Sequence, residues 1–260
     1  MPETLDCTGV PYIQDILNYL PFDPANDGDV GTYIQSITNL VAVNYKYEQY
    51  QFAYFGVHLL YMTYIYSAIW KVSKIAPERY SDSIIFARPY RNRENDVDIN
   101  DVNSIFDYSL MPEKDIAKVF KIIGLDKSHI SNVGGIVDTR NDMAHASGKF
   151  EILTEDGFNV KVNAVVASIR NINRCMEKQI RLWFEKILLE FCNGKFSEYQ
   201  DEKDIITEQM VQNFKMSVNE LLICNTMSIR DIVTEHRNFE PKLKKFKEAI
   251  ASYCEGCGYI

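Results

Sequence analysis

A stretch near the middle of the chain, Thr139-Arg140-Asn141-Asp142-Met143-Ala144-His145, carries residue types that can cleave a phosphodiester. Arginine offers a permanently charged fork of donors to a phosphate, and histidine takes or gives a proton near neutral pH. RNA supplies its own nucleophile, the neighbouring 2′-hydroxyl, so its cleavage needs no metal ion. We therefore expect Arg140 to stabilise the phosphate, His145 to transfer the proton and Asn141 to orient the reacting groups.

The spacing of Arg140 and His145 is weak evidence when it is taken alone. Two residues five apart on a helix lie about 140° apart around its axis, so they flank a site and do not stack. A second pair, Arg230 and His236, has a similar spacing. The first pair differs because the polar Asn141 follows the arginine and apolar residues lie on both sides. The alternative of a surface arginine beside a capping or core histidine stays open.

The composition predicts long helices that would position these residues. The chain has 260 residues, 46% of them hydrophobic, and only 12 Gly and 8 Pro against 16 Tyr and 14 Phe. Few turn formers and many aromatic residues are typical of an all-α protein with a sizeable core. No proline lies between residues 33 and 75, and a row of apolar residues there is spaced by three or four, which predicts one long central helix buried on two sides. That row is Phe52, Phe55, Leu59, Met62, Tyr66 and Ile69, and His58 beside it is expected to be a hydrogen-bonded core residue.

Smaller elements are expected around the motif. Pro112 and Gly124 bracket a short helix, and a further helix that starts at Ser128 or Ser131 carries the motif. Residues 150–162 alternate around Asp156-Gly157, which predicts a small β-hairpin. Another long helix is expected from about residue 164 to residue 192. The domain prediction is an irregular segment over residues 1–31, a helical bundle over 32–195, and a C-terminal helical extension over 196–260 packed on the bundle.

The motif and the order of elements resemble the HEPN superfamily (higher eukaryotes and prokaryotes nucleotide-binding). Its ribonucleases carry an arginine, a polar residue, and a histidine after four to six intervening positions, which Arg140, Asn141 and His145 match. The resemblance covers about residues 33 to 193. It implies a HEPN-like helical bundle, a homodimer whose two motifs form one composite groove, and metal-independent endoribonuclease activity that leaves a cyclic phosphate and a 5′-hydroxyl.

The resemblance also implies a biological setting and a range of partners. Such enzymes commonly act as toxins or antiviral effectors, so a regulatory or antitoxin protein is a possible partner. In toxins paired with a minimal nucleotidyltransferase, a tyrosine two residues after the histidine can be the modified position. Here Ser147 occupies that place, which argues against an antitoxin of that kind.

Local basic residues are the candidates for contact with RNA, because the net charge of −8 provides no general attraction for nucleic acid. Arg170, Arg174, Lys178 and Arg181 follow steps of four, four and three, so we expect them on one helix face. Arg88, Arg91 and Arg93 lie in a long loop and form a second candidate set. In both sets a solvated charged surface is the competing interpretation, since acidic residues lie nearby.

The remaining features predict a cytoplasmic protein without a cofactor or a metal site. The N-terminus has neither a basic start nor an apolar run, and the six cysteines lack a disulfide framework, which favours a reducing compartment. Residues 49–70 carry no charge but contain several tyrosine hydroxyls, which disfavour a membrane span. Cys254 and Cys257 form one pair without a matching second pair, which is insufficient for a structural zinc site.

A second function class stays open beside the ribonuclease. The chain would then be a noncatalytic helical HEPN-like interaction module that binds a partner protein or a nucleotide through its tyrosine-rich helix. Cleavage of RNA in the presence of EDTA would separate the two hypotheses, because only the first predicts it.

Overall fold

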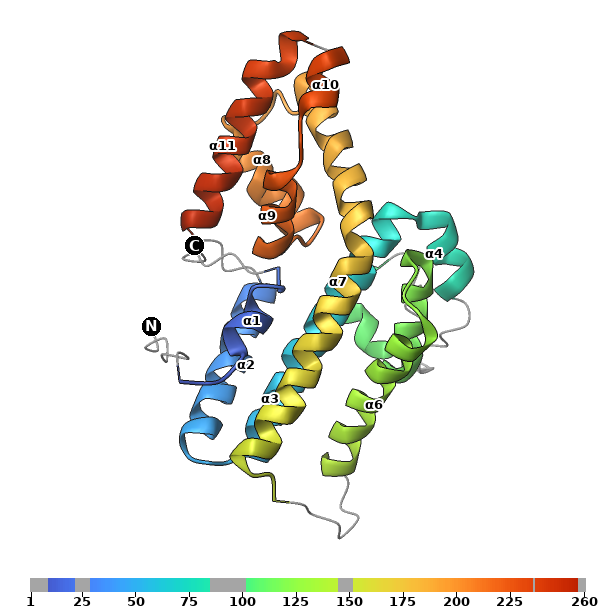
Figure 1. The fold of residues 1–260 in the computed structure, drawn as a ribbon, viewed down its shortest axis with the longest axis vertical. Coiled ribbons are helices and arrows are strands. Elements are labelled where there is room, and N and C mark those ends of the chain that lie inside the picture. Colours follow the sequence, from blue (N-terminus) through green and yellow to red (C-terminus); the bar gives the residue numbers. More distant parts are fainter. Residues whose placement is uncertain (1–8, 22–28, 85–101, 145–151, 236, 257–260) are drawn as a thin grey trace.

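Every regular element in the described part of the chain is a helix, which confirms the all-α prediction for these residues (Figure 1). The computed structural model describes residues 9–21, 29–84, 102–144, 152–235 and 237–256. In chain order the elements are α1 (Ile13–Leu17), α2 (Asp29–Lys46), α3 (Tyr50–Ile75), α4 (Pro77–Ile84), the 3-10 helix η1 (Ile105–Leu110), α5 (Glu113–Ile116), the 3-10 helix η2 (Ala117–Ile123), α6 (Lys127–Ala144), α7 (Glu155–Cys192), α8 (Glu202–Ile205), the π-helix η3 (Ile206–Asn213), α9 (Val218–Thr226), α10 (Arg230–Glu235), the 3-10 helix η4 (Arg237–Phe239) and α11 (Glu240–Gly256).

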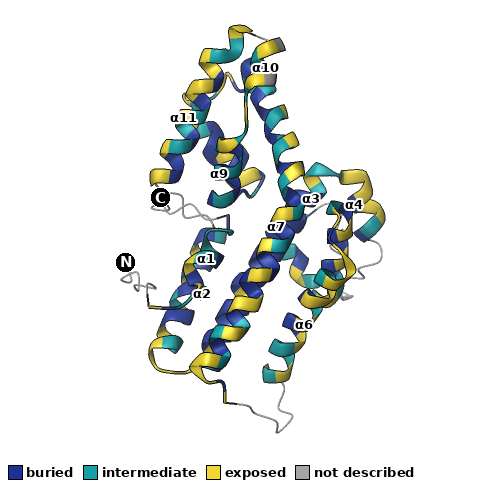
Figure 2. Cartoon of the chain, in the orientation of Figure 1, coloured by how far each residue is buried: buried dark blue, intermediate teal, exposed yellow. Residues whose placement is uncertain are grey.

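Helix α3 forms the centre of the molecule, and its neighbours cover most of its surface (Figure 2). It is long and apolar enough to cross a membrane, but 83% of its most apolar window is buried inside the protein. Two of the hydroxyls expected to disfavour a span are satisfied internally: Tyr61 bonds the Ser168 hydroxyl at 2.8 Å, and Tyr64 donates to the Ile169 carbonyl at 3.2 Å. This pattern is that of the core helix of a soluble protein.

The single long helix expected over residues 33–75 is two helices in the structure. Helix α2 ends at Lys46, Glu48 takes a left-handed conformation with φ of 59°, and α3 begins at Tyr50. The chain reverses there, and α2 packs along α3 (Figure 1). Gly56 permits the close approach, because a Cβ at this position would lie 2.5 Å from a Val41 methyl group. Hydrophobic periodicity continues across the break because both helices bury a face.

The prediction of a small β-hairpin over residues 150–162 is wrong for the described residues, which enter helix α7 at Glu155. Thr154 caps α7 by accepting a hydrogen bond from the Gly157 amide at 3.2 Å, and Glu155 begins the helix. Of the alternating apolar residues, Phe158 and Val162 are buried one turn apart, whereas Val160 is 71% exposed. The Thr154 cap and the burial of every fourth residue favour a helix, and they outweigh the alternating pattern that suggested a strand. Residues 150 and 151 lie outside the described part.

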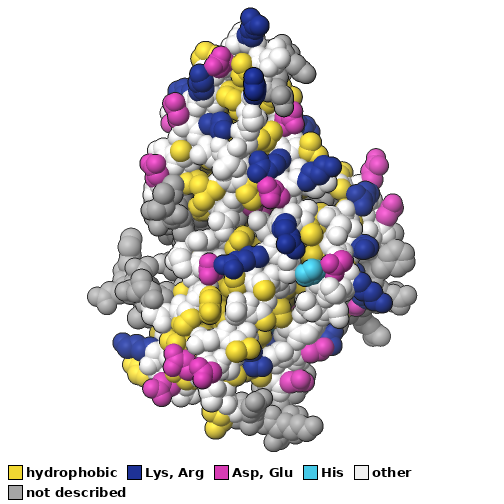
Figure 3. All heavy atoms as spheres, in the orientation of Figure 1, with side chains coloured by type: hydrophobic (Ala, Val, Ile, Leu, Met, Phe, Trp, Pro, Cys, Tyr) yellow, Lys and Arg dark blue, Asp and Glu magenta, His cyan; other side chains and the backbone are white. Residues whose placement is uncertain are grey.

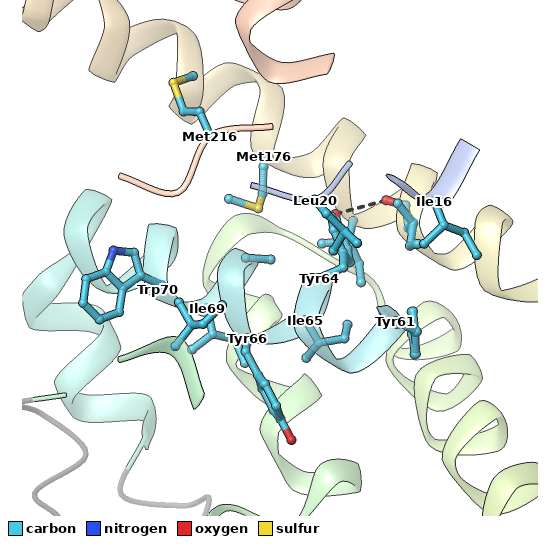
Figure 4. Packing of buried hydrophobic residues seen from close by; sticks show 14 of the residues in the cluster. Ile16, Leu20, Tyr61, Tyr64, Ile65, Tyr66, Ile69, Trp70, Met176 and Met216 are labelled. Atoms are coloured by element: carbon cyan, nitrogen blue, oxygen red, sulfur yellow. Dashed lines mark hydrogen bonds between the residues drawn. The ribbon is translucent and has the colours of Figure 1, made fainter. Parts of the chain in front are cut away.

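Both ends of the chain contact α7, and the N-terminal helix α1 also contacts α3. Residues 1–31, expected to be irregular, contain α1, whose Ile13 and Ile16 are buried with Leu20. In Figure 4 this segment lies beside Tyr64 of α3. Helices α8 to α11 form a unit that contacts the upper half of α7, with α9 packed between α7 and α11 (Figure 1).

A buried ion pair joins the C-terminal unit to α3. The Lys71 ammonium lies 2.5 and 2.6 Å from the two carboxylate oxygens of Glu220 on α9, and both residues are almost fully buried. The Ser217 amide and hydroxyl also donate to the Glu220 carboxylate, at 2.9 and 3.2 Å. Because the carboxylate is saturated with donors, its burial is compensated.

Candidate functional site

Arg140 lies near the end of α6 and faces inward. Its Nη2 donates to Oε2 of Glu113, the first residue of α5, and the two side chains are 26% and 24% exposed. The bond forms because α5 packs on α6 and Pro112 starts α5 at that point. Nε of Arg140 is buried and has no partner among the described residues. The guanidinium is therefore held at one edge and retains an unsatisfied donor.

The same Glu113 oxygen contacts a histidine from the central helix. Oε2 of Glu113 lies 3.2 Å from Nε2 of His58, which is 1% exposed. The expectation that His58 is a hydrogen-bonded core residue is confirmed. An ionised carboxylate only accepts, so Nε2 carries the proton, while Nδ1 is buried without a partner among the described residues. The Glu113 carboxylate on α5 thus bonds an imidazole of α3 and a guanidinium of α6, and so links the three helices.

The charges around Glu113 shift its pKa. Burial by itself raises the pKa of the Glu113 carboxyl, but the hydrogen bonds and positive charges of His58 and Arg140 outweigh burial and lower this pKa below the ordinary value of a glutamate. Burial raises the pKa of the nearby Tyr66 hydroxyl, Glu113 raises it further, and Arg140 opposes this rise. The carboxylate is therefore ionised at neutral pH, and Tyr66 stays a neutral wall of the cluster.

The structure describes Asn141 of the motif but not His145. Asn141 follows Arg140 on α6 and is half-buried, a 100° turn away around the helix axis. His145 lies outside the described residues, directly after the end of α6 at Ala144. The convergence of Arg140 and His145 therefore stays a prediction. His236, the histidine of the second pair, also lies outside the described part.

The basic residues of α7 share one exposed face, as the spacing predicts, and Figure 3 shows Lys and Arg side chains interspersed with carboxylates over this helix. Arg174, Lys178 and Arg181 line a shallow depression of about 360 Å³. Three of the four basic side chains already have polar partners in the chain. Arg170 pairs with Asp15 at 3.2 Å and Arg181 with Glu177 at 2.8 Å, while Arg174 donates a hydrogen bond to Asn171 at 2.9 Å. Arg174 and Lys178 therefore have no ion pair among the described residues.

The structure does not bring this basic face together with Arg140 in one chain. A groove of about 440 Å³ separates α6 from α7, and Thr139 lines it, whereas Arg140 turns toward Glu113. Helices α6 and α7 run antiparallel (Figure 1). At 1.5 Å per residue, Arg140 lies about 6 Å from the end of α6, while Arg170 and Arg181 lie about 22 and 39 Å along α7. The loop candidates Arg88, Arg91 and Arg93 lie outside the described residues.

A scan against protein-family models and searches of curated proteins and solved structures found no match for this chain. The site is therefore defined by its geometry. Sequence reasoning did not find Glu113, whose partners lie 55 and 27 residues away along the chain. The position of Glu113 at a helix start was visible in the sequence, but its contact with Arg140 depends on how α5 packs.

Proposed function

We propose that the chain is a metal-independent endoribonuclease of the HEPN type. In this proposal the 2′-hydroxyl attacks the adjacent phosphorus, its proton passes through His145, and the 5′-oxygen leaves protonated. The products are a cyclic phosphate and a 5′-hydroxyl. Arg140 stabilises the charge on the phosphate and Asn141 orients the reacting groups. No cofactor takes part.

The environment of Arg140 is the observation that carries this proposal. A guanidinium whose one edge is fixed by a carboxylate is preorganised, because it loses little side-chain freedom when it binds an anion. Nε has no partner among the described residues, and a buried donor left unpaired destabilises the protein unless an acceptor reaches it. A phosphate oxygen is an acceptor of the required charge. Glu113 is a positioning residue in this scheme.

Exposed apolar side chains on α2 and α3 support the proposed homodimer. This apolar surface consists of Leu40 and Val43 of α2, Tyr47 in the turn after α2, and Phe52 and Leu59 of α3, all at least 38% exposed. Leu59 follows His58, the partner of Glu113, so a second copy seated on this surface would bring two Arg140 clusters to one interface. A two-fold dimer uses the same surface on both chains, as a composite site requires.

The cellular setting is proposed from the resemblance to HEPN ribonucleases. We place the chain in the cytoplasm, without a membrane, as a toxin or antiviral effector whose activity a regulatory or antitoxin protein would restrain. Arg170, Arg174, Lys178 and Arg181 would contact the RNA backbone outside the cleavage site, since they lie on another face from Arg140. The same role is proposed for Arg88, Arg91 and Arg93.

Cleavage of total RNA by the purified chain in excess EDTA tests the proposal. The wild type should produce fragments with cyclic-phosphate and 5′-hydroxyl ends, and His145→Ala should produce none. His129→Ala is the matched control, because it removes an imidazole from the other end of α6, where His129 pairs with Asp126. Equal cleavage by wild type and His145→Ala would reject the assignment.

The Arg140–Glu113 ion pair favours a second candidate function. Since a carboxylate already neutralises the guanidinium, Arg140 is also explained as a structural residue of a noncatalytic interaction module. Most tyrosines of α3 are buried, so this module would bind a partner protein or a nucleotide through the exposed apolar surface and not through the tyrosines that the sequence suggests. This candidate predicts no RNA cleavage under any condition. It also predicts that Phe52→Glu abolishes recovery of a partner in a pull-down.

A further inference from the structure

A cavity far from Arg140 combines aromatic and basic side chains. It has a volume of about 420 Å³ and lies between the C-terminal end of α3, the upper part of α7 and the π-helix η3. Its lining includes Lys74, Trp183, Lys186, Lys195 and Phe214. The volume falls in the range of small-molecule sites, which join apolar walls with a few polar groups.

The wall of the cavity is aromatic. The Trp183 and Phe214 rings are stacked, with their centroids 3.7 Å apart and an interplanar angle of 10°. Trp70 lies next to this wall and donates its indole N–H to the Asn213 carbonyl at 2.8 Å. Both tryptophans of the chain are therefore at or beside this cavity. A flat wall of this kind suits a planar ring.

The rim of the cavity carries more positive than negative charge. Lys195 pairs with Glu190 at 2.9 Å, which leaves Glu198 as the other carboxylate of the lining. The lining also contains the exposed Lys74 and Lys186, which have no ion pair among the described residues and outnumber the Glu198 carboxylate. The Lys74 ammonium lies 4.7 Å from the centre of the Trp70 ring. In a chain of net charge −8, this local excess favours an anionic ligand.

The backbone at the cavity is unusual as well. Helix η3 is a π-helix of eight residues, a rare form that occurs frequently at functional sites. Just beyond it, Lys215 has a φ of 62°, a left-handed conformation that is strained for a lysine. Lys215 lies 5.9 Å from the Trp70 ring, and burial lowers its pKa. The strained segment thus carries another cation toward the same aromatic group.

We propose that this cavity binds a nucleoside phosphate, with the base against the Trp183–Phe214 wall and the phosphate on Lys74 and Lys186. A sugar phosphate would use the lysines but not the aromatic wall, and an uncharged ring would use the wall but not the lysines. The cavity belongs to the junction with the C-terminal unit, so the proposal does not depend on RNA cleavage at Arg140.

Titration of the full chain with AMP, followed by intrinsic tryptophan fluorescence and by calorimetry, tests the proposal. Because both tryptophans lie at or beside the cavity, saturable binding should change the emission. Adenosine and ribose 5-phosphate, each lacking half of the ligand, should bind at least about tenfold more weakly than AMP. No saturable heat or fluorescence change with AMP, or equal binding of ribose 5-phosphate, would overturn the assignment.

Single lysine substitutions locate the ligand. Lys74→Ala and Lys186→Ala should each raise the Kd for AMP about tenfold, as expected when a charged hydrogen bond is lost. Lys127→Ala is the matched control: it removes one exposed ammonium at the start of α6, away from the cavity, and should leave the Kd unchanged. If Lys127→Ala weakens binding as much as Lys186→Ala does, binding is nonspecific and the site is refuted.

Discussion

Glu113 links the chemistry of the candidate site to the fold. Its carboxylate accepts from His58 on the central helix and from Arg140 on the motif helix, so one side chain fixes the relation of three helices. Hydrogen bonds to an ionised group are among the stronger polar interactions, and the Glu113 carboxylate is partly shielded from water. The geometry of Arg140 should therefore depend on the ionisation of Glu113.

Glu113→Gln should lower the free energy of unfolding by about 1–2 kcal/mol at pH 7, because the amide keeps the shape but loses the charge. The pKa of Glu113 is lowered in the folded chain, so its contribution is present above the ordinary carboxyl pKa and disappears as pH falls through the folded value. Urea unfolding of wild type and variant at neutral and acidic pH measures this. A difference that is absent at pH 7 or grows in acid would refute the role.

The residue types of the site were predictable, but their contacts were not. Arg140 and Asn141 could be selected because a charged and a polar residue stand together with apolar residues on both sides of the motif. Glu113 could not be selected, since a carboxylate after a proline is ordinary at a helix start and its partners come together only through packing. The inward orientation of Arg140, away from the basic face of α7, also depends on tertiary structure.

At the scale of elements, the prediction succeeded where a cap or a long periodic segment was decisive and failed where periodicity was ambiguous. Gly124, with φ of 86°, ends the segment that Pro112 introduces, as expected, but this segment is α5 followed by the 3-10 helix η2 and not one helix. The break at Glu48 was missed because Glu48 is neither glycine nor proline, yet it takes a left-handed conformation. The start of α7 was missed because Asp-Gly also fits the first turn of a helix capped by Thr154.

The Lys71–Glu220 pair should be essential for attaching the C-terminal unit. Glu220→Gln leaves a buried ammonium without its counter-charge, so we expect a loss of about 3–5 kcal/mol in unfolding free energy. The double variant Lys71→Met/Glu220→Leu should recover most of this loss, because neither charge remains. Urea unfolding followed by tryptophan fluorescence measures both variants.

The exposed Lys114–Asp138 pair provides the control, since both side chains are about half exposed. Lys114→Ala should leave the unfolding midpoint nearly unchanged. If Glu220→Gln is as mild as this control, the buried pair does not hold the C-terminal unit on α3.

At the scale of the whole molecule, the two long faces have different characters. The outer face of α7 is charged, whereas α2 and the first half of α3 expose apolar side chains. Phe52 and Leu59, expected in the core, are 47% and 38% exposed. Several large exposed apolar side chains on two helices that pack together are typical of an interface.

Phe52→Glu/Leu59→Glu should convert the proposed dimer into a monomer, because two carboxylates would be buried at the two-fold interface. Light scattering coupled to size-exclusion chromatography measures the mass. The control is Val160→Glu, which places the same charge on an apolar residue of α7 that is 71% exposed, and it should remain dimeric. A wild-type mass of one chain, or a dimer that survives the double substitution, would contradict this interface.

The central claim is that Arg140 and His145 act on the same phosphate. Its most direct test is the single-turnover cleavage rate of a labelled RNA in excess EDTA, for wild type, Arg140→Ala and His145→Ala, with Arg79→Ala as the exposed-arginine control. We predict losses of about 10²-fold or more for both motif variants, with unchanged helical content and RNA affinity within a few-fold. Cleavage at the wild-type rate by either motif variant would contradict the account.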